Sequence, residues 1–214
     1  MAWRAVIFDL GGVVLPSPFD TFAEYERTHG LPDRFIRTVV ASSADHGAWA
    51  RLERGEVDLA EFAEAFAAEC AAAGGTVDAL ELMAAIGAGS GPRPEMIAAI
   101  RTIRERGLRT GALTNNWAPA VPVPEAVPGN GFAGLGDLFD TIVESAVEGL
   151  RKPDRRIYEL ACARLDVTPV ETVFLDDLGV NLKPARALGM TTIKVVEPGA
   201  ALEELSEVLG FPLP

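Results

Sequence analysis

The sequence predicts an α/β fold in which a doubly wound parallel sheet carries a helical unit inserted after its first strand. From residue 94 onward, short apolar runs rich in β-branched residues alternate with single amphipathic helical patterns. A further apolar run, Ala5 to Phe8, stands apart near the N-terminus, and the residues between it and residue 91 show helical periodicity without a strand signal. Strands separated by single helices imply right-handed crossovers and parallel pairing. We expect residues 1–16 and 92–214 to form the α/β core and residues 17–91 the helical unit.

Composition is that of an ordinary globular protein with a full core: 214 residues, 49% apolar and 23% charged. The net charge of −12 argues against nucleic acid or an anionic membrane as a main partner. It does not exclude an anionic substrate, because positive charge can gather locally at a site. The partners we expect are a small phosphorylated molecule, as argued below, and no nucleic acid or membrane; a homodimer remains open.

The cysteines and the apolar segments bear on the compartment. Cys70 and Cys162 each lie inside an apolar helical pattern, which predicts buried thiols in a reducing cytosol rather than a disulfide. The N-terminal apolar run is interrupted by Asp9, which is not typical of a signal peptide. No stretch approaches the roughly 20 apolar residues of a membrane span. We therefore expect a cytoplasmic protein.

Within the helical unit, the apolar periodicity predicts a series of helices. Asp58 with Glu61 three residues later fits a capping box at the start of the longest one. The stripe Phe62, Phe66 and Cys70 then marks its buried face. The predicted helices cover residues 19–29, 33–40, 46–54, a segment from 59 to the glycines at 74–75, and 77–86.

Strands and helices alternate in the rest of the chain. The predicted strands are 109–113, 141–143, 172–175 and 191–196. The predicted helices are 95–106, 154–165, 181–188 and 200–209, with Gly107 and Gly189 as stop signals. Segment 118–136 holds four prolines and four glycines and lacks periodicity, which is typical of a functional or mobile loop.

Polar residues follow the first four of the five predicted strands. Asp9 follows the first and Thr114 the second, Lys152 lies after the third, and Asp176 with Asp177 ends the fourth. The carboxyl ends of parallel strands lie along one edge of the sheet, where open α/β folds bind their ligands. Residues spread over the whole chain should therefore meet at that edge.

The chemistry of this set suggests phosphoryl transfer. Neighbouring carboxylates raise one another's pKa values unless a cation is present, and Lys152 supplies only one positive charge. The remaining negative charge and the all-oxygen donors suit Mg²⁺. Thr114 and the backbone N–H groups of Asn115 and Asn116 offer donors to an anion. Asp9, followed by two glycines that let the backbone approach a ligand, would act as a carboxylate nucleophile and form an aspartyl phosphate.

Four motifs in order resemble the haloacid dehalogenase-like hydrolase superfamily. They are FDLGGV at 8–13, LTNN at 113–116, RKPD at 151–154 and FLDDLGVN at 174–181. Segments 114–117 and 176–186 are also similar to the N-terminal phosphatase domains of soluble epoxide hydrolases and to the related domain fused to some acyl-CoA dehydrogenases. The resemblance implies a Rossmann-like core, a helical cap at 17–91, and Mg²⁺-dependent hydrolysis of small-molecule phosphate monoesters.

The resemblance also implies a role for each position. Asp9 would be nucleophile and metal ligand, the Gly11 carbonyl a metal ligand, and Lys152 the balancing charge. Thr114 and Asn115 would hold the phosphate, joined by Asn116 from the argument above. Asp177 would bind the metal with Asp176 in support or as a further ligand.

One position departs from the resembling phosphatases, which usually carry a second Asp two residues after the nucleophile as general acid. Here that position is Gly11. A backbone carbonyl remains, but a proton donor that typically raises the reaction rate by about 10²–10⁴-fold is lost. We expect His46 in the cap to be the first candidate for a replacement donor.

Two alternative functions stay open on this sequence. One is a metal-independent 2-haloacid dehalogenase in which Asp9 attacks carbon, since residues 152–158 are similar to that branch too. Against it, the dehalogenase branch typically has Ser-Asn at the two positions where this chain has Asp176-Asp177. The other, motivated by Gly11, is a catalytically weak binding or regulatory protein.

Overall fold

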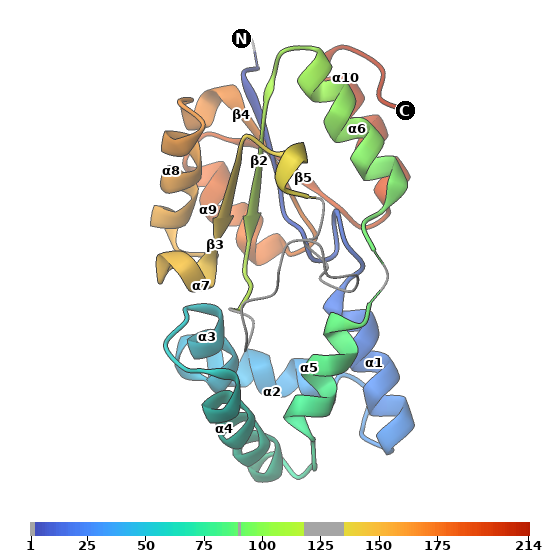
Figure 1. Ribbon diagram of the computed structural model, residues 1–214, viewed down its shortest axis with the longest axis vertical. Coiled ribbons are helices and arrows are strands. Elements are labelled where there is room, and N and C mark those ends of the chain that lie inside the picture. The colour runs from blue at the N-terminus through green and yellow to red at the C-terminus, as the bar shows by residue number, and fades with distance from the viewer. Residues whose placement is uncertain (1–2, 90, 118–134) are drawn as a thin grey trace.

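The computed structural model describes residues 3–89, 91–117 and 135–214. Figure 1 shows a sheet covered by helices on both faces and a group of helices beyond one end of the sheet. The predicted loop 118–136 lies outside the described residues except for its last two positions, so that prediction stays untested.

The described strands form one five-stranded sheet in the order β3-β2-β1-β4-β5. Their bounds are β1 (Ala5–Phe8), β2 (Arg109–Thr114), β3 (Thr141–Glu144), β4 (Thr172–Asp176) and β5 (Thr191–Lys194). Every neighbouring pair is parallel. The doubly wound parallel fold is therefore confirmed, with the change of winding direction between β1 and β4, where such sheets place their ligands.

The register explains why the strand ends meet. Phe8 of β1 pairs with Ala112 of β2 on one side and with Leu175 of β4 on the other. The residue after Phe8 therefore lies beside the end of β4 and near the end of β2. β1 and β4 are buried along their whole length, as expected of central strands in a sheet covered on both faces.

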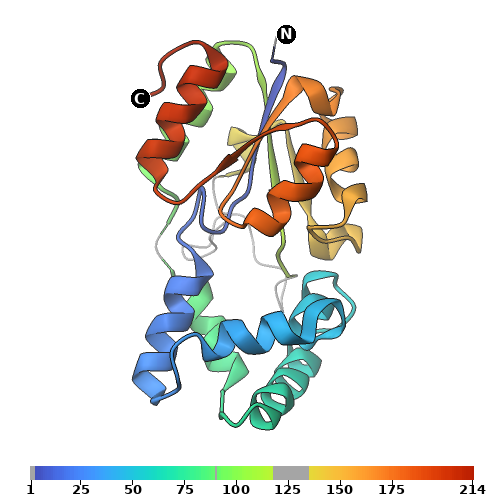
Figure 2. The same cartoon turned by 180° about the vertical axis from the view of Figure 1, so that it is seen from behind.

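Helices on the two faces close separate parts of the core (Figures 1 and 2). On one face α6 (Pro94–Glu105) and α10 (Pro198–Leu209) pack their apolar residues against Val6 and Phe8. On the other, α8 (Arg155–Arg164) and α9 (Gly179–Ala187) pack against Ile7 and Phe174. The short helix α7 (Ser145–Glu148), which follows β3, was not predicted.

The helices between β1 and β2 have a core of their own. They are α1 (Pro18–His29), α2 (Phe35–Ser43), α3 (Ala48–Glu53), α4 (Leu59–Ala72) and α5 (Ala79–Gly87), with a 3₁₀ turn at Ala44–His46. Phe22, Trp49, Phe62 and Phe66 form its aromatic centre. The Asp58 capping box is confirmed. A helical insert is thus confirmed, while the residue numbers proposed for its boundaries remain a prediction.

The predicted helix 33–40 shifts most, to Phe35–Ser43, and the predicted helix 46–54 is shorter than expected. The structure has a 3₁₀ turn up to His46, and α3 begins only at Ala48 because Gly47 between them is extended. The other helices and strands shift by a few residues at their ends. Within the described ranges, no helix combines the length and the apolar character that crossing a membrane requires.

Candidate active site

Three carboxylates meet at the carboxyl edge of the sheet. Asp9 follows β1, Asp176 ends β4 and Asp177 comes next. Each offers an oxygen, and these oxygens all lie within 4.8 Å of one another. Asp9 and Asp176 are buried and Asp177 is half-buried. The sequence reasoning correctly placed these residues together.

Lys152 lies between two of these carboxylates. Its Nζ is 2.8 Å from Oδ2 of Asp9 and 2.7 Å from Oδ2 of Asp176, and its side chain is 1% exposed. Burial opposes the charge, but the adjacent carboxylates Asp176 and Asp9 raise the pKa of Lys152, so the ammonium stays charged. Such a buried lysine is stable only because it is paired on both sides.

Asp176 has all its hydrogen-bonding capacity occupied. Its Oδ1 accepts from the backbone N–H of Leu178 at 2.8 Å, and Nδ2 of Asn181 donates to both carboxylate oxygens at 3.0 and 3.1 Å. With Lys152 on Oδ2, this carboxylate holds the lysine in place. The geometry therefore favours the supporting role for Asp176 and gives Asn181 a matching one.

Asp9 and Asp177 both have raised pKa values. Burial raises the pKa of Asp9 well above its ordinary value, against the opposing charge of Lys152. Burial, and then the neighbouring Asp176, raise the pKa of Asp177 to about 6. Three carboxylates with one ammonium leave uncompensated negative charge in a poorly hydrated space. A cation bound here would relieve it.

The glycines shape the space next to Asp177. Gly12 has a left-handed backbone with φ of 81°. A Cβ on Gly12 would lie 2.7 Å from Cγ of Asp177 and closer still to its Oδ2, so only glycine fits there. Asp9 and Asp177 offer carboxylate oxygens beside this tight loop, which is the donor type that a hard divalent cation such as Mg²⁺ prefers; the Gly11 carbonyl remains a predicted ligand.

The predicted phosphate-binding residues divide into two groups. Thr114, the buried last residue of β2, and Asn115 lie at the carboxyl edge beside Lys152. Asn115 is firmly oriented: its Oδ1 accepts from the backbone N–H of Lys152 at 2.8 Å and its Nδ2 donates to the carbonyl of Lys152 at 3.1 Å.

Asn116 has other partners. Its backbone N–H donates to Oγ of Ser145 at 2.9 Å, and its side-chain amide donates to Glu144. Both groups that could face a phosphate are therefore engaged with the end of β3. This geometry favours Asn116 as a support of the loop, although its predicted role in phosphate binding stays a prediction.

Sequence reasoning missed a contact between the insert and the sheet, the clasp formed by Glu53 and Arg151. Nε of Arg151 donates to Oε2 of Glu53 at 2.7 Å, and Asn115 donates to the same oxygen at 3.3 Å. Burial raises the pKa of Glu53, while Arg151 opposes that effect. No local pattern could have revealed this pair, because 98 residues separate its members.

The remaining candidates lie further out. His46 is exposed at the end of the 3₁₀ turn. His29 stacks on Tyr25 at the surface, and Lys183 and Arg186 lie on the exposed face of α9 as expected of a solvated helix. Trp117 packs against Trp49 of the insert, with ring centroids 6.2 Å apart.

The fold and the site together define a Rossmann-like α/β hydrolase with a helical cap. The chain belongs to the haloacid dehalogenase-like hydrolase family, which matches it over residues 3–189. The resemblance inferred from the four motifs is thereby confirmed.

Curated relatives include phosphatases and longer multidomain proteins. The chain is 39% identical to mouse acyl-CoA dehydrogenase family member 10 over 99% of its own length and 20% of the relative's. It is 34% identical to pig bifunctional epoxide hydrolase 2, over 100% of this chain and 40% of that protein. A sesquiterpene phosphatase of Aspergillus oryzae is 28% identical, and the match spans 97% of both chains. The chain thus spans less than half the length of the two longer relatives.

Solved structures share the fold. A HAD-like family hydrolase from Porphyromonas gingivalis superposes with a TM-score of 0.68 at 21% identity, over 98% of both chains. A HAD family enzyme from Bacteroides thetaiotaomicron, in complex with magnesium and inorganic phosphate, gives a TM-score of 0.61 at 20% identity over 90% of this chain and 94% of that one. At these identities the likeness concerns the fold alone.

Proposed function

We propose that this chain is a Mg²⁺-dependent phosphatase that hydrolyses small-molecule phosphate monoesters through a phosphorylated Asp9. The observation that carries the proposal is the surroundings of Asp9. Its Oδ2 lies 2.8 Å from Nζ of Lys152, and the carboxylate of Asp177 is close by. The similarity to a sesquiterpene phosphatase along the whole chain supports it, as do the magnesium and inorganic phosphate bound by the Bacteroides enzyme, which shares the fold.

In the first step, a carboxylate oxygen of Asp9 attacks phosphorus while the bond from phosphorus to the ester oxygen breaks. The leaving group departs with the electron pair of that bond; an alkoxide then takes a proton from solvent, because Gly11 offers none, whereas an aryl oxide can leave unprotonated. In the second step, water attacks the phosphorylated Asp9, releases inorganic phosphate and restores the carboxylate. Asp9 is held for this by the N–H of Leu10, which donates to its Oδ1 at 2.7 Å, and by Lys152 on its Oδ2.

The other residues bind and balance charge. Thr114 and the backbone N–H of Asn115 would hold the phosphoryl oxygens, and the two bonds between the Asn115 side chain and the backbone of Lys152 fix the loop that carries this N–H. Asp9, Asp177 and the Gly11 carbonyl would hold the metal. When bound, Mg²⁺ supplies positive charge that stabilises the phosphoryl oxygens during transfer. Asp176 keeps Lys152 charged and in position.

One assay separates the three candidate functions. Release of phosphate from p-nitrophenyl phosphate and of halide from a 2-haloacid is measured with and without Mg²⁺, with Asp9→Asn as the matched control. Phosphate release that needs Mg²⁺ and disappears in the variant supports the proposal. Metal-independent halide release would instead indicate a dehalogenase, and the absence of both activities a binding protein.

We further propose a cytoplasmic location and no nucleic-acid or membrane partner. Cys70 and Cys162 are free and buried, as expected in a reducing compartment, and the net charge is −12. Sedimentation of the purified chain would test whether it forms a homodimer.

A further inference from the structure

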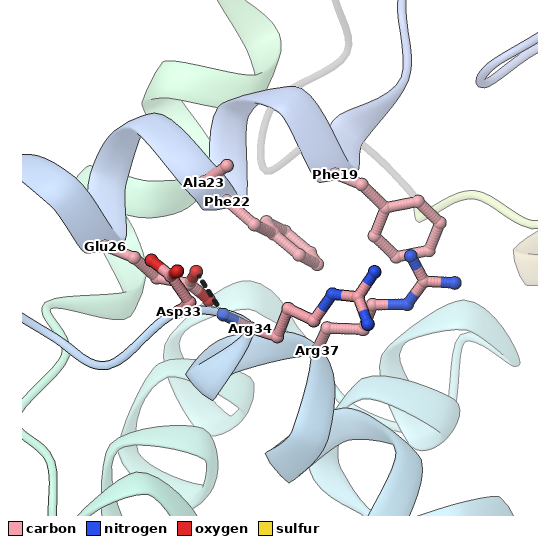
Figure 3. A pocket seen from close by; sticks show the side chains of 7 residues that line it. All are labelled: Phe19, Phe22, Ala23, Glu26, Asp33, Arg34 and Arg37. Atoms are coloured by element: carbon pink, nitrogen blue, oxygen red, sulfur yellow. Dashed lines mark hydrogen bonds between the residues drawn. The ribbon is translucent and has the colours of Figure 1, made fainter.

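A cavity between α1 and α2 opens in the helical insert (Figure 3). Its volume is about 360 Å³, within the range of small-molecule sites. Phe19, Phe22 and Ala23 give it an apolar wall, while Arg34 and Arg37 bring two guanidinium groups. In Figure 3 both guanidinium groups point in the same direction, toward the ring of Phe19. In Figure 2, α2 runs across the front of the insert, below the sheet.

The two arginines differ from others of the chain in having no acidic partner. Among the described residues, neither guanidinium lies within 4.0 Å of a carboxylate. A second cavity at the seam of insert and sheet is lined by Arg54, Arg151 and Arg156, and each of those is paired with a carboxylate at 2.6 to 2.9 Å. The contrast is one between the two cavities, since exposed arginines elsewhere, such as Arg101 and Arg109, also lack an ion pair among the described residues.

The acidic side chains of the cavity do not neutralise these arginines. Glu26 is buried, and its carboxylate oxygens accept from the backbone N–H groups of Arg34 and Ile36, both at 2.8 Å. Asp33 also lines the cavity but lies beyond ion-pair distance of both guanidinium groups. Donors for an anion therefore remain available on this wall.

Two contacts place the arginines on this wall, one through the backbone of Arg34 and one through the side chain of Arg37. Arg34 has a left-handed conformation with φ of 63°, which a non-glycine residue adopts only where its surroundings stabilise it. The two bonds to Glu26 hold this conformation at the start of α2. Arg37 lies one turn further along, with its guanidinium carbon 4.2 Å from the centroid of the Phe19 ring. Both arginines are exposed, so the fixed features of this wall are the backbone of Arg34 and the ring contact of Arg37.

The cavity lies next to the acidic site. Phe19 follows Pro18, whose Cδ would be 3.5 Å from a Cβ placed on Gly11. On the other wall, the Phe22 ring packs on Trp49, and Trp49 on Trp117, just beyond Asn115 and Asn116.

We propose that the cavity of Phe19, Phe22, Arg34 and Arg37 is the leaving-group subsite and selects phosphate monoesters that carry an apolar body and a second anionic group. The inference rests on the proposed phosphatase function. With the reacting phosphate at Asp9, the rest of the substrate extends from the sheet edge toward the insert. Its apolar part contacts Phe19 and Phe22. Its second anion, a carboxylate or another phosphate, binds mainly to Arg37, with Arg34 as a further donor.

The test compares substrates that differ by one charge. kcat/KM is measured for phenyl phosphate, 4-carbamoylphenyl phosphate, 4-carboxyphenyl phosphate and 1,4-phenylene bisphosphate. We expect the wild type to favour the two doubly anionic esters over the carbamoyl ester by about tenfold or more, mainly through KM, because a charged hydrogen bond contributes about 1.5–3 kcal/mol. The ratio between the carboxyl and phosphate esters identifies which anion the subsite prefers.

Variants assign the preference to the arginines. Arg37→Gln should reduce the ratio of doubly anionic to carbamoyl ester about tenfold, and adding Arg34→Gln should bring it close to one. Arg27→Gln is the matched control, because Arg27 is exposed on α1 and paired with Glu24, away from the cavity. It should leave the ratio unchanged.

A binding measurement keeps this inference separate from the catalytic proposal. Calorimetric titration with phenylphosphonate and 4-carboxyphenylphosphonate in the presence of Mg²⁺ needs no turnover. Tighter binding of the carboxyl compound that disappears in Arg37→Gln supports the subsite even if no phosphatase activity is found. Equal affinities for both compounds, binding of neither, or a preference that survives in the double variant would overturn the inference.

Discussion

Replacing Gly11 by aspartate tests whether the missing general acid limits this enzyme. The structure has room for it: a Cβ on Gly11 would lie 3.5 Å from Cδ of Pro18, an ordinary van der Waals contact. Gly11 also does not have the positive φ that favours glycine, so an L side chain causes no backbone strain there. The new carboxyl group would project from the same loop as Asp9, two residues away, where the resembling phosphatases carry their proton donor.

The expected gain depends on the leaving group. General acid catalysis is worth about 10²–10⁴-fold, or about 2.7–5.4 kcal/mol in the barrier. An opposing effect comes from adding a negative charge beside Asp9 and Asp177, whose pKa values are already raised by burial. A net gain of about tenfold to a hundredfold on alkyl phosphates is expected, with little change on aryl phosphates, whose leaving groups depart without a proton.

The assay is a plot of log kcat/KM against leaving-group pKa for the wild type and the variant. The wild-type line should be the steeper one. Gly11→Asn, of equal size but unable to donate a proton of suitable pKa, should retain the wild-type slope. Parallel lines for Gly11→Asp and wild type would refute the reasoning, and an already flat wild-type line would mean that another residue donates the proton, with His46 the first to examine.

Four further predictions follow from the same site. Asp9→Asn should abolish turnover and leave the circular dichroism spectrum unchanged; residual activity above a few per cent would reject Asp9 as nucleophile. Asp177→Asn should weaken Mg²⁺ binding in calorimetric titrations, and unchanged affinity would transfer that role to Asp176. In the wild type, Mg²⁺ affinity should fall as the pH drops through about 6, because protonation of Asp177 competes with the metal; a flat profile there would contradict the assignment. Glu53→Ala should lower the free energy of unfolding in urea by about 2–4 kcal/mol, since Arg151 and the indole N–H of Trp49 lose their acceptor; a loss below about 1 kcal/mol would show that the clasp contributes little.

The sequence was sufficient where structure depends on local patterns or on chain topology. The apolar runs of β1 and β4 predict buried central strands, and the carboxylates and the lysine meet because parallel strands end at one edge. The capping box at Asp58 is similarly local, and it was predicted in full.

The sequence was insufficient where a side chain has two suitable partners or a distant one. Asn116 follows β2, where phosphate binding is proposed, yet Ser145 and Glu144 engage its donors because β3 lies next to β2. The left-handed Arg34 depends on the carboxylate of Glu26, eight residues earlier, which no helical pattern marks. α7 is too short for its periodicity to be recognised.

The contact between Trp49 and Trp117 gives the molecule an internal optical probe. Trp49 belongs to the helical insert, whereas Trp117 lies three residues after the last residue of β2, and their rings meet edge to face at 6.2 Å. Trp3, the remaining indole of the chain, donates a hydrogen bond to the carbonyl of Val208 and belongs to the sheet's own core. Movement of the insert would therefore change the fluorescence emission of Trp49 and Trp117 and leave that of Trp3 unaffected. Stopped-flow fluorescence could time the motion without any label, and a Trp117→Phe substitution would remove the signal.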